Sequence, residues 1–105
     1  MSETKIDISR ASKAIRDSRF VEALSMLESN LAKDPDHLES LYFEAVCSRY
    51  LKNYKDSQKY LENLLTKAPD MGRAYQELGH LSKAIGNGEN AASHYRQACE
   101  LNPAL

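Results

Sequence analysis

Hydrophobic and polar residues along the chain follow the spacing of amphipathic helices. From Phe20 to Leu31 the apolar side chains recur every three or four residues, which places them on one helical face. The same spacing returns from Tyr54 to Leu65. The whole pattern predicts six helices, over residues 4–16, 20–33, 37–51, 54–67, 71–85 and 88–101. Links of about two to four residues make consecutive helices antiparallel neighbours.

Three prolines reveal a repeat within this pattern. Pro35, Pro69 and Pro103 follow one another at intervals of 34 residues, a period typical of stacked repeat architectures. At the same interval small residues align with small ones and apolar residues with apolar ones. The aligned columns are Ala11–Ala45–Gly79, Ala23–Ser57–Ala91, Leu27–Leu61–Tyr95 and Leu31–Leu65–Cys99. Stacked helices need small residues facing large ones. The sequence therefore predicts a single domain over 1–105, with helix pairs at about 4–37, 38–71 and 72–105.

Polar residues mark where individual helices begin. Asp36 and Glu39 have the spacing of a capping box, and Asn53 and Asn87 stand just before the fourth and sixth apolar faces. We expect these side chains to cap the helices that follow. The prolines end the second, fourth and sixth helices, because proline lacks an amide hydrogen and disfavours helix in the residue before it.

The period and its columns resemble the tetratricopeptide repeat. The third pair carries the aromatic, Leu-Gly, Ala, aromatic and Pro positions of that family as Tyr75, Leu78, Gly79, Ala91, Tyr95 and Pro103. The chain departs from the family in having no Trp, and in having Ser48 and Ser82 where Tyr is favoured. The resemblance implies an all-α fold, an α-solenoid of six antiparallel helices in a right-handed superhelical stack. It also implies that the first helix of each pair lines a concave surface that holds peptides or partner helices.

Composition and charge exclude several classes of function. The chain contains 14 Lys and Arg residues and 15 Asp and Glu residues, which gives a net charge of -1. Because the domain as a whole is not basic, we expect no nucleic-acid partner. No apolar run reaches the roughly 18 residues of a membrane span, and the first residues are too polar for a signal peptide. These features predict a cytoplasmic protein without a membrane partner.

No set of residues predicts catalysis. His37, His80 and His94 are scattered, and a metal site needs about three or four convergent ligands. We therefore expect no enzyme activity in this segment, no metal and no cofactor. Cys47 and Cys99 fall on apolar helical faces, where a free thiol acts as a small hydrophobe.

The inward-facing columns that the resemblance assigns predict a basic groove with aromatic residues. Its partner-binding residues are Tyr42, Phe43, Val46, Arg49, Tyr50, Arg73, Gln76, His80 and Lys83. The columns as a whole contain five cations (Lys5, Arg16, Arg49, Arg73 and Lys83) and two carboxylates (Glu39 and Glu77), hence a net charge of +3. We expect Arg49, Arg73 and Lys83 to pair with acidic groups of a protein or peptide partner. Alternatively, Tyr42 and Phe43 cover the junction with the first pair.

The resemblance also predicts that the chain does not bind the acidic tail of heat-shock chaperones. In repeats that grip the acidic tail of heat-shock chaperones, Lys, Asn and Arg side chains form a clamp. The matching positions are Ile8, Ser12, Phe43, Arg73 and Glu77, of which only Arg73 fits.

Two other functions stay open from the sequence. Residues 74–80 and 102–105 resemble repeat arrays that precede bacterial sulfotransferase domains, so the segment could be an N-terminal docking or regulatory part of a larger enzyme. A self-associating structural adaptor is the second. The chain stops about two residues after Pro103, where the family places a capping helix, so we expect a fragment of a longer protein. We also expect a homodimer through the uncovered residues Leu81, Ile85, Tyr95 and Cys99.

Overall fold

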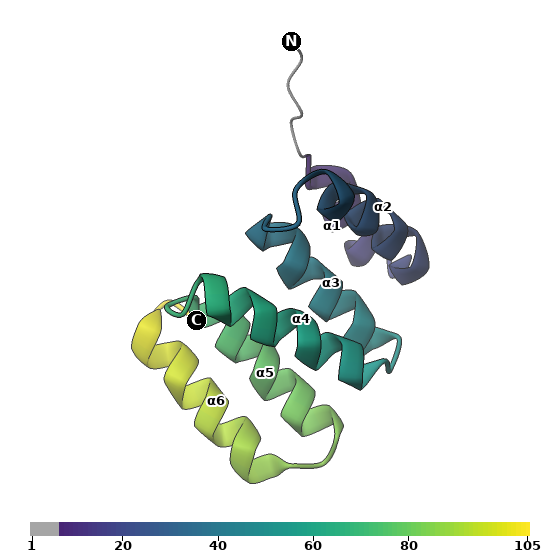
Figure 1. Cartoon of the computed structure of the whole chain (residues 1–105). Helices are drawn as coiled ribbons and strands as arrows, with labels where there is room; N and C mark the ends of the chain where they lie inside the picture. Colours follow the sequence, from purple (N-terminus) through teal and green to yellow (C-terminus); the bar gives the residue numbers. More distant parts are fainter. Residues whose placement is uncertain (1–6) are drawn as a thin grey trace.

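The computed structural model describes residues 7–105, and this part of the chain forms six helices and no strand (Figure 1). The helices are α1 (Ser9–Arg16), α2 (Phe20–Lys33), α3 (Leu38–Tyr50), α4 (Tyr54–Lys67), α5 (Gly72–Ala84) and α6 (Gly88–Leu101). The predicted bounds of α2, α4 and α6 agree to the residue, and α3 and α5 are each one residue shorter at both ends. The predicted fold class, an all-α stack of helix pairs, is confirmed.

The first helix starts later than the predicted residue 4. Residues 4–6 lie outside the described residues, and within the described part α1 begins only at Ser9. The Asp7 carboxylate accepts a hydrogen bond from the Ser9 amide at 2.9 Å. Because this side chain takes one of the first amide groups of the helix, Asp7 and Ile8 form the approach to α1 and not its first turn.

The helix caps follow the prediction in part. The prediction of a capping box at Asp36 is wrong. The N-cap of α3 is His37, whose Nδ1 accepts a hydrogen bond from the Ser40 amide at 3.2 Å. Residues 35–36 form a turn after α2, so α3 starts one residue later than a cap at Asp36 would require. Asn53 is the N-cap of α4 without a side-chain cap bond. The Asn87 cap is confirmed, since its Oδ1 accepts from the amide three residues on.

The helices pack as three antiparallel hairpins that stack on one another. The hairpins are α1–α2, α3–α4 and α5–α6, and the stack is held by contacts of α2 with α3, of α4 with α5 and of α3 with α5 (Figure 1). The second helix of each hairpin thus rests on the first helix of the next, as a solenoid requires.

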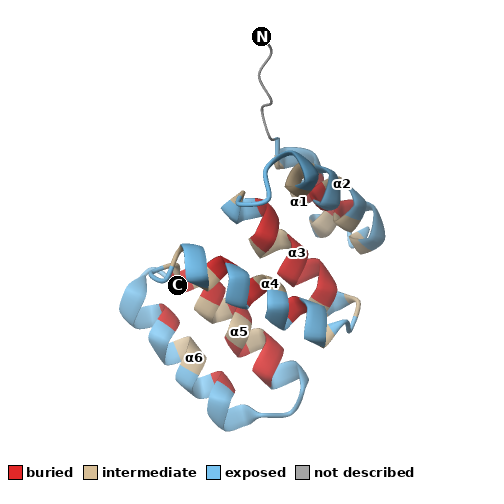
Figure 2. Ribbon diagram, in the orientation of Figure 1, coloured by how far each residue is buried: buried red, intermediate tan, exposed pale blue. Residues whose placement is uncertain are grey.

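Two hydrophobic cores lie along the stack, and Figure 2 shows their buried positions where neighbouring helices face each other. The N-terminal core consists of Ala11, Ala14, Ala23, Leu27 and Cys47. The central core consists of Leu41, Ala45, Leu61, Leu64, Ala74 and Leu81. Both contain an aligned small residue and an aligned leucine from the repeat columns. Cys47 belongs to α3, so the N-terminal core also ties the first hairpin to the second.

Gly79 shows why the small column must stay small. A Cβ atom on this glycine would collide with the ring of Tyr95 on α6. The hydroxyl of Tyr95 lies 2.8 Å from His80 Nδ1 on α5, which holds the ring in place. The close approach of α5 and α6 therefore depends on the missing side chain at Gly79.

The predicted open face at the C-terminal end is only partly open. Leu81 is buried in the central core, so the expectation that it is uncovered is wrong. Tyr95 is half-buried, so only part of its side chain is uncovered. Ile85 is 56% exposed, and Cys99 is exposed on the outer side of α6. The prediction of two structural cysteines therefore holds for Cys47 alone. Burial raises the pKa of the Cys47 thiol to about 12 and keeps it protonated.

A carboxylic acid lies inside the stack, at a column position where the third repeat has Leu78. Glu44 on α3 is 1% exposed, and its Oε1 atom has no hydrogen-bond partner among the described residues. Burial raises the pKa of Glu44 to about 7, with further contributions from Glu28 on α2 and Asp56 on α4, while the nearby Tyr60 hydroxyl opposes the shift. The residue is therefore protonated in the folded protein over a pH range in which it ionises in the unfolded chain.

The first prediction concerns Gly79. Overpacking a core costs about 1–3 kcal/mol, and the better helix propensity of Ala returns up to about 1 kcal/mol. Gly79→Ala should therefore lower the free energy of unfolding by about 1–2 kcal/mol in urea titrations followed by circular dichroism. Gly88→Ala is the matched control, because nothing lies within 4 Å of its Cβ position. Equal stabilities of the two variants would contradict the close packing of α5 on α6.

The second prediction concerns Glu44. Its folded-state pKa lies above the unfolded value, so its contribution to stability is fully present below about pH 4.5 and is lost as the pH rises towards 7. The difference in free energy of unfolding between Glu44→Gln and the wild type should therefore grow by about 2–3 kcal/mol in favour of Gln between pH 4.5 and 7.5. Urea unfolding at both pH values measures it. The exposed Glu62→Gln is the control, and a pH-independent difference for Glu44→Gln would contradict the burial of this acid.

Candidate functional site

Arginine and aromatic side chains gather where α3 meets α5. The guanidinium carbon of Arg73 on α5 lies 4.4 Å from the ring centroid of Tyr42 on α3, and 5.9 Å from that of Phe43. The two rings pack edge to face with centroids 5.2 Å apart. We call this region the α3–α5 surface; it comprises Tyr42, Phe43, Arg49, Tyr50, Arg73, Glu77 and His80. It contains six of the nine residues predicted to bind a partner, together with Glu77.

Arg49 and Glu77 form an ion pair that links the two helices of this surface. Arg49 Nε donates to Glu77 Oε2, and Arg49 Nη2 lies 3.4 Å from Oε1. The Glu77 side chain is 2% exposed and that of Arg49 is 17% exposed. Arg49, which the sequence predicts to pair with a ligand, therefore already has an intramolecular carboxylate as its partner.

Two aromatic residues of the surface hold the first hairpin in place. The ring of Tyr50 stacks on that of Phe20 on α2, with centroids 4.5 Å apart and planes 6° from parallel. Arg49 lies over the Tyr50 ring at 4.5 Å. Phe43 packs against the N-terminal core. The alternative role considered for Phe43, to cover the junction with the first pair, is therefore what the structure shows, and Tyr50 shares it.

His80 closes the surface towards α6. Its Nδ1 lies 2.8 Å from the Tyr95 hydroxyl, and the two rings meet edge to face. Burial lowers the pKa of His80, so at neutral pH the ring adds no positive charge to the surface. Burial also raises the pKa of Tyr42, whose phenol stays neutral beneath Arg73.

The other predicted residues lie at different depths. Val46 is buried and Gln76 is half-buried, whereas Lys83 is exposed and has no ion pair within residues 7–105. Lys5 lies outside the described residues. Of the cations that the sequence assigned to the inner face of the second and third repeats, Arg73 and Lys83 are thus the two not already held by a carboxylate in the described part of the chain.

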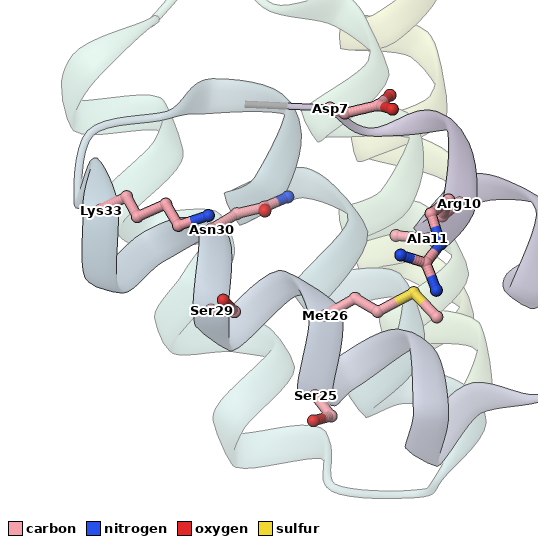
Figure 3. Close-up of a pocket in the computed structure, with 8 residues that line it drawn as sticks. All are labelled: Asp7, Arg10, Ala11, Ser25, Met26, Ser29, Asn30 and Lys33. Carbon is pink, nitrogen blue, oxygen red and sulfur yellow. The ribbon is translucent and has the colours of Figure 1, made fainter. Parts of the chain in front are cut away.

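A polar hollow in the first hairpin was not predicted from the sequence. A hollow of about 390 Å³ lies between α1 and α2 and is lined by polar side chains (Figure 3). The signal that could have found it is the presence of Asp7, Arg10 and Asn30 in columns where the later repeats place Leu41, Leu78 and Leu64.

Two kinds of site are not found in the described residues. No group of three or more His, Cys, Asp and Glu side chains there could hold a metal ion. None of the helices α1 to α6 combines the length and the apolar character that crossing a membrane requires.

Comparison with known proteins identifies the repeat and the fold. Residues 72–105, which contain α5 and α6, match the family model described as a tetratricopeptide repeat. No curated protein matches the chain at a significant level.

Several solved structures share the fold. One is the first tetratricopeptide repeat domain of Spaghetti (RPAP3) bound to the HSP90 peptide SRMEEVD, with a TM-score of 0.81 and 18% identity over 92% of this chain and 77% of that one. Another is MamA, residues 41 to the end, from Desulfovibrio magneticus RS-1, with a TM-score of 0.77 and 21% identity over 93% of this chain. A double mutant of MamA from RS-1 gives a TM-score of 0.76 at 21% identity. The chain spans 55% of the length of each of these two MamA chains.

Proposed function

Because residues 72–105 are a tetratricopeptide repeat and the chain has the fold of a tetratricopeptide solenoid, we propose that it is a non-catalytic protein-binding module. Its ligand is an acidic peptide or helix that binds at the α3–α5 surface. The observation that carries this proposal is Arg73, whose guanidinium lies against Tyr42 and forms no ion pair with any described residue.

The stacking prepares Arg73 for a carboxylate. The guanidinium carbon lies 4.4 Å from the Tyr42 ring centroid and no described carboxylate pairs with Arg73, so its N–H groups can donate to a carboxylate of the ligand. Since Tyr42 and Phe43 already restrict the side chain, less conformational entropy is lost when a ligand binds. Hydrogen bonds of this charged type contribute about 1.5–3 kcal/mol each where water is partly excluded.

The neighbouring positions define the rest of the ligand's chemistry. Lys83 follows Arg73 on α5 by ten residues, which corresponds to about 15 Å along the helix axis. Gln76 lies between them with both a donor and an acceptor. A ligand with two acidic groups and a polar segment between them therefore complements α5, and the His80 ring, neutral at pH 7, adds no charge.

The ligand differs from the one bound to RPAP3 in its solved structure. Of the clamp positions, Phe43 packs against the N-terminal core and Glu77 is buried in its ion pair with Arg49. The Ser12 hydroxyl accepts from Arg16 at 3.3 Å. With only Arg73 in common, the α3–α5 surface does not reproduce a Lys/Asn clamp for a chaperone tail.

Two alternatives stay predictions. A docking segment of a larger enzyme, such as a sulfotransferase, is one of them. Self-association through the C-terminal end is the other, and its favourable observation is the exposure of Ile85 and Cys99, while Leu81 is buried. The mass of the protein in solution over a dilution series tests the second.

The third prediction tests Arg73 with a hexaglutamate peptide as the probe. In ¹⁵N–¹H correlation spectra, the α5 amides should shift on titration, and Arg73→Gln should raise the dissociation constant at these amides about tenfold. Higher salt should weaken the binding of the wild type, because the attraction between exposed charges is screened.

Arg96→Gln on the exposed side of α6 is the matched control and should leave the constant unchanged. With SRMEEVD as a second probe, the peptide and a scrambled version should bind equally well. Equal losses for Arg73→Gln and Arg96→Gln would show that charge alone, and not the α3–α5 surface, attracts the peptide.

A further inference from the structure

The hollow between α1 and α2 is lined mostly by charged and polar side chains. It has a volume of about 390 Å³ and, as Figure 3 shows, side chains from both helices border it. Cations, hydroxyls and an amide dominate its lining. We call it the α1–α2 hollow; its charged and polar residues are Asp7, Arg10, Ser25, Ser29, Asn30 and Lys33.

Two lining positions of the hollow align with positions that are mostly buried in the later hairpins. Arg10 aligns with Glu44 and Leu78, and Asn30 aligns with Leu64 and Ala98. Glu44, Leu64 and Ala98 are all buried in the structure. In the later hairpins, mostly buried side chains occupy these positions between the two helices. In the first hairpin, the same positions border a polar hollow. A polar outer face is expected of a terminal repeat.

Solubility at the end of a stack does not explain how the charges are distributed. The described part of the first repeat has five cations, and three of them have partners. Lys13 pairs with Asp17, Arg16 bonds to Ser12, and Arg19 pairs with Asp17 and Glu22. Arg10 and Lys33 have no such partner among the described residues, and both line the hollow. The Asp7 carboxylate bonds to Ser9. Of the three cations of this hairpin that have no carboxylate partner among the described residues, Arg10 and Lys33 line the hollow and Arg16 does not.

The two cations stand at different ends of the hollow. In Figure 3 the Arg10 guanidinium lies beside Met26, whereas the Lys33 ammonium lies beside Asn30. Met26 and Lys33 are seven residues apart on α2, or about 10 Å along its axis. One phosphate group is too small to bridge such a separation. Two carboxylates three residues apart on a polyproline II segment point to the same side about 9 Å apart and match it.

We propose that the α1–α2 hollow is a second binding site, which takes an acidic polypeptide segment through two carboxylates. Arg10 binds one carboxylate and Lys33 the other. The Ser29 hydroxyl between them, and that of Ser25 next to Met26, donate to the backbone carbonyls or side chains of the segment. The site is independent of the α3–α5 surface, because no residue belongs to both.

The fourth prediction tests this site in the whole chain by the same residue-resolved titration with hexaglutamate. The amides of Ser25, Ser29 and Asn30 should shift saturably in the wild-type protein. In the double variant Arg10→Gln/Lys33→Gln these shifts should fall at least tenfold at equal peptide concentration. Lys13→Gln/Arg19→Gln, which removes two paired cations of the same hairpin, is the matched control and should keep them.

The outcomes separate this site from the α3–α5 surface. Arg73→Gln should leave the shifts at Ser25, Ser29 and Asn30 unchanged, so failure at one site does not imply failure at the other. Three results would overturn the proposal: no saturable shift in α2, shifts that persist in Arg10→Gln/Lys33→Gln, or equal shifts with inorganic phosphate at the same concentration. The last would show that the hollow takes single oxyanions instead of a peptide.

Discussion

The Arg49–Glu77 ion pair is the interaction on which the α3–α5 surface depends. A carboxylate that is 2% exposed must be compensated, since removing a charge from water without a partner costs several kcal/mol. Arg49 supplies that compensation across the contact between α3 and α5. Its guanidinium also lies over Tyr50, which stacks on Phe20 of α2. A continuous set of contacts therefore runs from the third repeat through the second to the first.

This pair also decides which cations of α3 and α5 remain unpaired among the described residues. A count of formal charges treats Arg49, Arg73 and Lys83 alike, yet Arg49 is satisfied within the chain and Arg73 is held by a neutral ring. The surface is thus less basic than its composition suggests, and its main unpaired guanidinium lies over the Tyr42 ring. A stacked Arg recognises the geometry of a carboxylate, whereas a mobile Lys such as Lys83 contributes mostly attraction.

The repeat period was enough to predict most of the fold. It placed α2, α4 and α6 to the residue and identified the small column whose meaning Gly79 shows. Features that depend on contacts between distant residues were missed. The pairing of Arg49 with Glu77 joins residues 28 positions apart, and the burial of Glu44 depends on both α2 and α4. The N-cap of α3 is His37 and not the predicted Asp36, because residues 35–36 form a turn. Cys99 is exposed because no other helix in residues 7–105 covers its face of α6.

The most direct test of this account measures the affinity of Glu77→Gln for hexaglutamate at the α5 amides. Loss of the carboxylate frees Arg49 beside Arg73, so hexaglutamate should bind about three to ten times more tightly than to the wild type, and its binding should weaken more steeply with salt. Arg49→Gln should instead weaken binding, because it leaves the Glu77 carboxylate uncompensated one helical turn from Arg73. Helical circular dichroism confirms that each variant is folded. An unchanged or weaker affinity of folded Glu77→Gln would contradict the claim that this ion pair controls the charge of the α3–α5 surface.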